Sequence, residues 1–238
     1  MVRLYVDQPL CPGQSVVLTQ QQAHYLFGVM RLSVGAELSV FNGEDGEWRA
    51  EVAEVHKRRG SLTAIRQTKP LQLPPDLWLL FAPIKKARTD FIVEKAAEMG
   101  VSRICPMRTE FTNSERLRQD RLQAHAVEAA EQCGGTFVPV VEEMTTLQAR
   151  LNAWPADRSM IFCDEALHDA PPISADQMPG APAALLIGPE GGFSPTERAA
   201  LRAHPQATAI SLGPRILRAD TAAVAALTLW QSAKGDWA

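Results

Sequence analysis

Two short stretches near the C-terminal end have the residue types of ligand-binding loops. In the first, the apolar run 183–187 is followed by the sequence GPEGG at 188–192 and then by a helical pattern. Glycine has no Cβ, so the backbone of such a loop can approach a ligand closely. Ser194, Pro195 and Glu197 predict a capped helix start directly after it. The order strand, glycine loop, helix predicts a binding loop; a plain turn without a ligand is the alternative.

The second stretch repeats this order in the sequence SLGPRILRADTA at 211–222. Residues 208–212 are expected to form a strand that Gly213 and Pro214 end, and Asp220 or Thr221 is expected to cap a long apolar helix. If the two strands are neighbours, the two loops lie side by side and form one pocket. Neither loop has the G-x-x-x-x-G-K-[ST] or G-x-G-x-x-G spacing of the common nucleotide-binding loops.

Together, IGPEGGFSPTE and SLGPRILRADTA resemble the C-terminal signature of the RsmE family. These SPOUT-superfamily enzymes methylate N3 of a uridine in 16S ribosomal RNA. The segments KKARTDFIVEKAAEMG from Lys85 and EAAEQCGGTFVP at 128–139 are also similar to the family. Two departures stand out: Gly135 replaces a common arginine, and TEFTNS at 109–114 replaces the usual E-R-S or E-R-C. If those family arginines contact RNA, Arg108 or Arg116 is expected to supply the charge instead.

Residues 1–72 are expected to form an N-terminal domain rich in short strands. A small closed or nearly closed barrel with one helix across it suits this number of strands. The expected strands are 3–6, 15–19, 37–42, 47–56 and 61–67, and the helix is 20–32. The resemblance implies a PUA-like, RNA-binding β-barrel at this position. Three prolines within 69–76 mark the linker.

Residues 73–238 alternate between apolar strand-length runs and helical patterns, which is typical of an α/β domain with a mostly parallel sheet. The run 77–84 is continuously apolar, as expected of a strand buried on both faces. The further expected strands are 101–106, 137–141 and 160–163, and the expected helices are 89–99, 117–133, 147–151 and 221–230. The trefoil knot of SPOUT enzymes is implied by the resemblance alone.

The resemblance also implies S-adenosylmethionine as the cofactor, held by both loops. The expected cofactor-binding residues are Ile187, Gly188, Pro189, Glu190, Gly191, Leu212, Gly213, Ile216, Leu217, Arg218, Thr221 and Ala222. No metal is expected, because the sulfonium of this cofactor is already a good leaving group.

A uridine N3–H is only weakly acidic, so its methylation needs a nearby cation to stabilise the anion and a carboxylate to take the proton. Arg218 is predicted to be the cation, although a structural salt bridge is the alternative. Glu190 and Asp220 are candidates for orientation or proton transfer; Asp220 stands where many relatives carry Glu. A charge partner for the following helix dipole is an equal alternative for Glu190.

The expected RNA-binding residues are Arg3, Arg31, Lys57, Arg58, Arg59, Lys85 and Arg108. Arg3 and Arg31 match family arginines, whereas the basic run 56–60 is most simply a solvated hairpin end. The net charge of −3 is not that of a general nucleic-acid binder, so any RNA contact must be a local patch.

Four scattered cysteines without a C-x-x-C pair argue against a disulfide framework or a zinc site and favour a reducing cytoplasm. No uncharged run is long enough for a membrane span. The apolar last helix predicts a homodimer, as in the superfamily. The expected function is N3 methylation of a uridine in 16S rRNA of the small ribosomal subunit. The alternatives are a SPOUT methyltransferase acting on another RNA and a non-catalytic RNA-binding or assembly factor.

Overall fold

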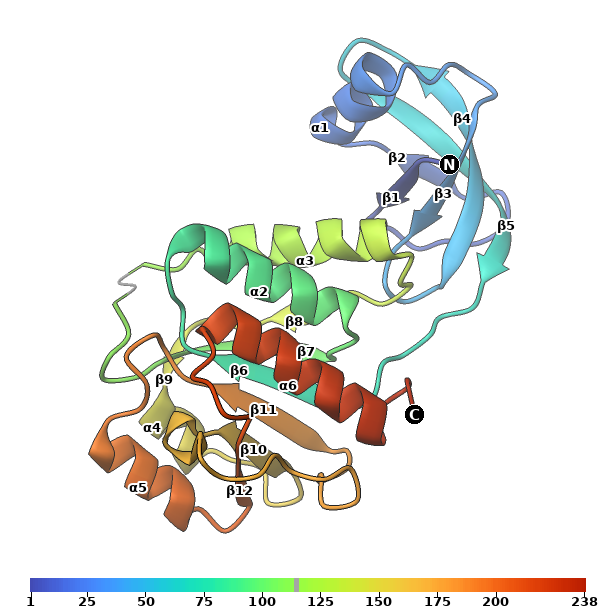
Figure 1. The fold of residues 1–238 in the computed structure, drawn as a ribbon. Coiled ribbons are helices and arrows are strands. Elements are labelled where there is room, and N and C mark those ends of the chain that lie inside the picture. Colours follow the sequence, from blue (N-terminus) through green and yellow to red (C-terminus); the bar gives the residue numbers. More distant parts are fainter. Residues whose placement is uncertain (114–115) are drawn as a thin grey trace. The chain divides into compact units, whose positions relative to one another are not determined.

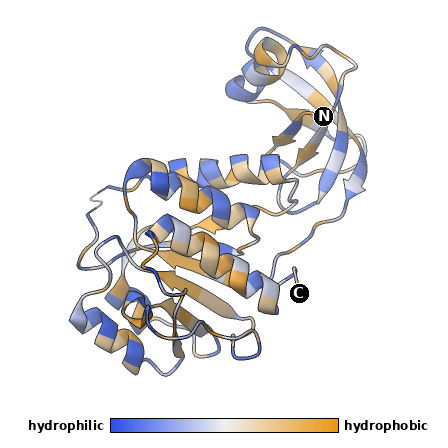
Figure 2. Cartoon of the chain, in the orientation of Figure 1, coloured by the Kyte–Doolittle hydropathy of each residue, from blue (hydrophilic) through white to orange (hydrophobic). Residues whose placement is uncertain are grey.

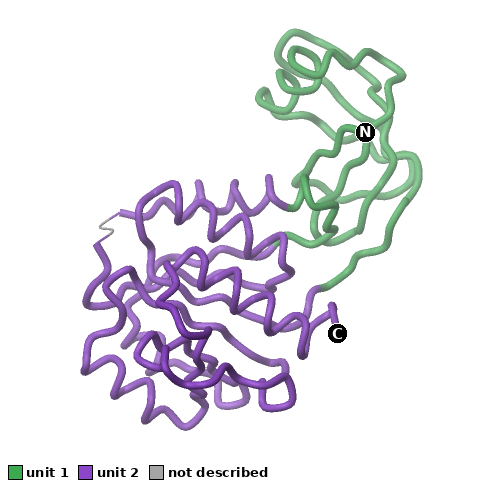
Figure 3. The backbone as a smooth tube through the Cα atoms, in the orientation of Figure 1, with its two compact units in different colours: residues 1–73, 130–138 green, residues 74–129, 139–238 purple. Residues whose placement is uncertain are grey.

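The structure, a computed structural model, describes residues 1–113 and 116–238. It divides into two compact units (Figure 3). Unit 1 comprises residues 1–73 and 130–138, and unit 2 comprises residues 74–129 and 139–238. The inclusion of 130–138 in unit 1 was not expected from the sequence.

Unit 1 is built on a curled sheet of five short strands in the order β1-β3-β4-β5-β2 (Figure 1). The strands are β1 (Arg3–Tyr5), β2 (Ser15–Val17), β3 (Glu37–Phe41), β4 (Glu47–Val55) and β5 (Gly60–Lys69). Alternate side chains point to one core that includes Val16, Val40, Val52 and Leu62. Register shifts between β4 and β5 increase the local twist that a curled sheet requires. The sheet confirms the predicted PUA-like fold class, as a half-barrel with β1 and β2 at its ends.

The helix expected at 20–32 is a short α1 (Gln20–Ala23) that continues as the π-helix η1 (His24–Val29). A capping box between Thr19 and Gln22 starts it. It ends at Met30, and Arg31 then adopts the left-handed conformation with φ of 58°.

Unit 2 contains a parallel sheet in the order β12-β10-β11-β6-β7-β8, with β9 paired to β7. Its strands are β6 (Leu77–Phe81), β7 (Arg103–Arg108), β8 (Val140–Val141), β9 (Thr145–Thr146), β10 (Ser159–Cys163), β11 (Ala183–Ile187) and β12 (Ala207–Ile210). The central strands are hydrophobic along their length (Figure 2), as burial on both faces requires. The predicted α/β class with a mostly parallel sheet is confirmed.

Helices cover both faces of this sheet (Figure 1). The helices α2 (Lys86–Glu98), α3 (Gln119–Cys133) and α6 (Ala219–Lys234) lie on one face. The helices α4 (Leu147–Asn152) and α5 (Pro195–Ala203) lie on the other, where Leu147 and Leu201 join a core with Leu80, Phe162 and Leu186. Among the described residues, no helix is both long enough and apolar enough to cross a membrane.

Two details of the predicted loops need correction. Strands β11 and β12 are not neighbours, because β10 lies between them and pairs with both. Helix α6 begins at Ala219 with Arg218 as its N-cap, so neither Asp220 nor Thr221 caps it. Ser194 and Glu197 do form the predicted capping box at the start of α5, with Pro195 in its first turn. The trefoil threading stays a prediction.

Candidate active site

A pocket opens at the carboxyl ends of β10, β11 and β12, where both predicted loops leave the sheet. Carboxyl ends of parallel strands meet at one edge, so loops that follow them converge even when another strand separates them. Most of the predicted cofactor-binding residues line this pocket. They are Ile187, Gly188, Pro189, Glu190, Leu212, Gly213, Ile216, Leu217, Arg218 and Ala222.

Two predicted cofactor-binding residues, Gly191 and Thr221, are not among the lining residues. Gly191 lies against Phe111, because an added Cβ at 191 would come within 3.2 Å of the Phe111 Cβ. The Thr221 backbone N–H donates to Asp220 Oδ1 at 2.9 Å, and its side chain is exposed. Contact of these two residues with the cofactor therefore stays a prediction.

The segment after β10 forms part of the pocket wall, and sequence reasoning missed it. Cys163, Asp164, Glu165 and His168 all line the cavity. The signal was present in part, since 160–163 was expected to be a strand and acidic residues follow it directly. Without the strand order, nothing in the sequence placed this strand end between the two loops.

Asp164 holds this wall in place. Its side chain is fully buried, and its oxygens accept hydrogen bonds from Arg198 Nε at 3.0 Å and Arg202 Nε at 3.0 Å. Asp164 also accepts from the Ala166 backbone N–H, so it caps the turn that carries the next residues. A buried carboxylate needs such partners. The Asp164 contacts therefore tie the end of β10 to α5.

Glu165 points from this turn toward the GPEGG loop. Its carboxylate pairs with Arg198, and a Cβ added at position 192 would lie 2.2 Å from Glu165 Oε1. Gly192 has φ of 71°, which also favours glycine. The glycine at 192 thus makes room for a carboxylate that lines the pocket.

Cys163 is not a candidate nucleophile. Burial raises the pKa of its thiol to about 12, so the side chain is a neutral thiol at neutral pH. It contributes an apolar surface to the pocket.

Arg88, on α2, lies between the two predicted carboxylates. Arg88 Nη1 is 3.7 Å from Glu190 Oε1, and Arg88 Nε is 3.7 Å from Asp220 Oδ2. Both separations exceed hydrogen-bond length, so the link is Coulombic. One cation therefore joins the GPEGG loop to the first turn of α6, and this residue was not predicted.

The Arg218 side chain is exposed at the N-cap of α6 and reaches the pocket lining. A structural salt bridge was the alternative role for Arg218, but its guanidinium forms none within residues 1–113 and 116–238. It makes no capping hydrogen bond to α6 either. This leaves the cation available to a ligand.

Comparison with known proteins places this geometry in a family. Residues 71–231 match the model of the RNA methyltransferase domain, and residues 18–64 match the model of the RNA methyltransferase PUA domain. The ribosomal RNA small subunit methyltransferase E, or RsmE, of Rickettsia conorii is 29% identical over 94% of this chain and 93% of its own length. The chain belongs to the RsmE family.

Two solved structures show the same fold across the whole chain. An RsmE protein of Neisseria gonorrhoeae bound to S-adenosylmethionine has a TM-score of 0.90 at 25% identity, covering 100% of both chains. A Legionella pneumophila protein in complex with the same cofactor has a TM-score of 0.89 at 29% identity, covering 99% of this chain and 98% of that one.

The pocket of this RsmE-family chain suits a nucleoside with a charged tail. Leu212, Leu217 and Ile187 supply apolar surface for a flat base, and two loop backbones supply polar groups for its edge. Glu165 can accept hydrogen bonds from hydroxyl or ammonium groups. Within the described residues, no cluster of His, Cys, Asp or Glu could hold a metal ion.

The residues that the RsmE resemblance nominated for RNA binding lie in different surroundings. Lys85 is exposed and lines a second cavity together with Lys86 and Phe111. Arg108 lines a separate hollow with Glu197 and Gln148. Lys57, Arg58 and Arg59 are exposed at the end of the β4–β5 hairpin.

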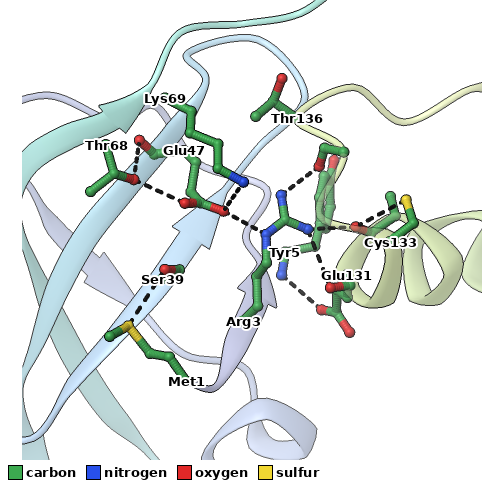
Figure 4. Close-up of polar contacts among 12 residues, drawn as sticks. Met1, Arg3, Tyr5, Ser39, Glu47, Thr68, Lys69, Glu131, Cys133 and Thr136 are labelled. Atoms are coloured by element: carbon green, nitrogen blue, oxygen red, sulfur yellow. Dashed lines mark hydrogen bonds and ion pairs between the residues drawn. The ribbon is translucent and has the colours of Figure 1, made fainter. Parts of the chain in front are cut away.

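Arg3 has a structural role inside unit 1 (Figure 4). Its Nε donates to Glu47 Oε2 at 2.6 Å, its Nη1 donates to Ala130 O and its Nη2 to Gly135 O. The guanidinium also stacks on Phe41, 3.8 Å from the ring centroid. Every nitrogen of this side chain has a partner within unit 1, so the structure gives Arg3 a structural role, and its contact with RNA stays a prediction.

The two RsmE-family departures fall in different units. Gly135, in place of the usual arginine, lies in unit 1, where its carbonyl accepts from Arg3. Within 109–114, Thr109 and Thr112 hydrogen-bond each other at 2.9 Å and form a tight turn, whereas Ser114 lies outside the described residues.

Proposed function

We propose that this chain uses S-adenosylmethionine to methylate N3 of a uridine in the 16S rRNA of the small ribosomal subunit. The observation that carries the proposal is the pocket at the ends of β10, β11 and β12, whose lining includes Arg218 and Glu190. Arg218 has no ion-pair partner among the described residues, and Asp220 lies near the pocket, 3.7 Å from the Arg88 that also neighbours Glu190. Membership of the RsmE family and the cofactor-bound structural relatives support the choice of cofactor.

The cofactor would be held by residues of all three strand ends. The apolar walls would enclose its adenine, and the backbone of 187–188 and 212–213 would bind the edge of that base. Glu165, which sequence reasoning missed, would accept from a ribose hydroxyl or the ammonium group. When bound, the cofactor supplies an electrophilic methyl group on a sulfonium.

In the proposed reaction the uracil N3–H bond breaks, the new N3–CH3 bond forms and the S–CH3 bond breaks. The products are N3-methyluridine, S-adenosylhomocysteine and a proton. Arg218 would stabilise the negative charge that develops on the uracil carbonyl oxygens. A carboxylate would take the proton, either Glu190 in the pocket lining or Asp220 in the first turn of α6.

Arg88 would hold both candidate carboxylates in place. It lies 3.7 Å from Glu190 and 3.7 Å from Asp220, so its positive charge attracts both side chains toward one guanidinium. We treat Arg88 as a positioning residue in this proposal.

Further RNA contacts would come from unit 1, through Arg31 and the hairpin residues Lys57, Arg58 and Arg59. His24, Phe27 and Lys57 line one hollow there, so base and cation contacts are available together. We also propose that the protein acts as a homodimer in the cytoplasm. Part of α6 supports the dimer, because Leu229 remains 39% exposed after the helix packs on its own sheet.

The test is methyl transfer from labelled cofactor to purified small subunits that lack the modification. We expect Arg218→Ala to reduce the rate by roughly 100-fold or more, as removal of a charge-stabilising donor does. Arg218→Lys should retain part of the rate because the positive charge remains. Calorimetry should show cofactor binding in both variants, and full activity of Arg218→Ala would reject the assignment.

The same experiment separates the alternatives. Methyl transfer to another RNA but not to small subunits would favour a different substrate. Absence of cofactor binding by calorimetry in the wild type would favour a non-catalytic RNA-binding factor. Primer extension across the 16S rRNA locates the product, because an N3 methyl group blocks base pairing.

A further inference from the structure

A second cavity in unit 2 lies beside the candidate active site and shares Pro189 and Glu190 with it. Its other walls include Lys85, Lys86, Phe111 and Arg116. It therefore combines an aromatic ring and three cations next to the GPEGG loop. The proposed cofactor contacts leave this cavity without an assigned ligand.

Phe111 is an exposed aromatic side chain held in a defined place. Phe111 is 42% exposed, and a Cβ added at Gly191 would lie only 3.2 Å from the Phe111 Cβ, so a larger residue at 191 would require Phe111 to shift slightly. A ligand that covered the exposed part of this ring would bury apolar area and gain free energy. A nucleic-acid base is a flat partner that stacks on such a ring.

The lysines occupy the positive end of α2, a 13-residue helix. Lys85 is its N-cap and Lys86 its first residue, no side chain caps it, and its first turn has no acidic residue. Cations are unfavourable at a helix N-terminus, whereas a bound anion is stabilised there by free N–H groups and the helix dipole. The charges at this end of the cavity are thus complementary to a phosphate.

We propose that this cavity receives the acceptor nucleotide, with Phe111 stacking on its base and Lys85 and Lys86 binding its phosphate. This inference rests on the proposed function, which supplies the idea that a methyl group moves from the cofactor to a uridine. Glu190 lies on the wall shared by both cavities, so a base stacked on Phe111 would have its edge next to the methyl donor and to a carboxylate. The chain carries Phe111 within the segment that departs from the family pattern.

The first test measures binding of uridine 5′-monophosphate and of uridine to the full-length protein by NMR, with S-adenosylhomocysteine present. We expect the nucleotide to bind more tightly than the nucleoside, because only the nucleotide has the phosphate. Lys85→Ala with Lys86→Ala should abolish this difference. Phe111→Ala should weaken both probes, and perturbation confined to residues outside this cavity would overturn the proposal.

The second test measures methyl transfer to small subunits at saturating cofactor. Phe111→Ala should reduce kcat/KM for the subunit by roughly 5- to 150-fold, the effect of one lost base stack. Phe111→Trp should retain activity, and cofactor affinity should be unchanged in both. Phe91→Ala is the matched control, since Phe91 is 38% exposed on α2 and outside the cavity.

The two proposals can fail separately. If the wild type transfers no methyl group to small subunits but still binds uridine 5′-monophosphate at Phe111, the proposed function fails and the nucleotide site stands. If the wild type is active and Phe111→Ala has the wild-type kcat/KM, the proposed function stands and the nucleotide site fails.

Discussion

At the scale of single residues, Arg31 occupies a conformation that disfavours its own side chain. It has φ of 58° directly after Met30, the C-cap of η1, and the Leu32 N–H donates to Leu26 O across it, as in helix ends where glycine usually stands. A non-glycine residue there costs about 1 kcal/mol. Because the exposed Arg31 destabilises the fold at this position, we infer that its role is to contact a ligand and not to stabilise the protein.

We therefore expect Arg31→Gly to stabilise the protein by roughly 0.5–1 kcal/mol and to weaken RNA binding. The slope of log Kd against log salt concentration should fall by roughly one, the share of one phosphate contact. Chemical denaturation and RNA titration at several salt concentrations measure the two effects. Arg31→Lys is the control: it should show neither the gain in stability nor the loss in slope.

Other residue roles could not be predicted from the sequence because they depend on distant partners. Arg3 matched a family arginine, but besides Glu47 its partners include the carbonyl groups of 130 and 135, more than 120 positions away. Arg88 is one of several basic residues near the start of α2, and only the fold places it between Glu190 and Asp220.

At the scale of elements, the sequence predicted those strands and helix starts that depend on local hydrophobic periodicity and on capping residues. The strand 183–187 and the capping box at Ser194 agree with the structure residue for residue. Strand order is a tertiary property, and so the position of β10 between β11 and β12 was missed, together with the acidic wall that follows it.

That wall leads to a prediction at the junction of β10 and α5. Asp164→Ala removes a fully buried carboxylate that accepts from Arg198 and Arg202. We expect the free energy of unfolding to fall by about 3 kcal/mol, because the arginines lose their buried partner. The dissociation constant of the cofactor should rise as well, because the turn carrying Glu165 loses its cap.

Denaturant titration and calorimetry measure these two effects. Asp169→Ala is the matched control, since that side chain is 92% exposed and its loss should change stability by less than about 0.5 kcal/mol. Wild-type cofactor affinity in Asp164→Ala would show that the β10 turn is not part of the binding site.

At the scale of the whole molecule, the two units are not two consecutive pieces of chain. Unit 1 takes in 130–138, where the Glu131 side chain accepts from the Tyr5 N–H and the Thr136 side chain accepts from the Gln72 N–H. The prolines near residue 70 indicate a linker between two domains. They do not indicate that residues 130–138, much later in the chain, pack with the first domain. Only a comparison with complete folded chains, such as the solved structures that match nearly the whole length, can reveal this kind of long-range arrangement.

The last prediction concerns assembly. Helix α6 buries Ala226, Leu227 and Trp230 within unit 2, but Leu229 stays 39% exposed. The first turns of the same helix line the candidate active site through Ala219 and Ala222. A second copy packed on this helix would thus stabilise the element that shapes the pocket.

Sedimentation of the 26.0 kDa chain should show a dimer at micromolar concentration, and Leu229→Glu should shift it to a monomer, because a charge would be buried in the interface. Cofactor affinity should fall in the monomeric variant. Val34→Glu is the control, since Val34 is 63% exposed in unit 1 and its replacement should leave the dimer intact. A wild-type chain that sediments as a monomer would instead mean that α6 needs no partner, and that the pocket is complete within one copy.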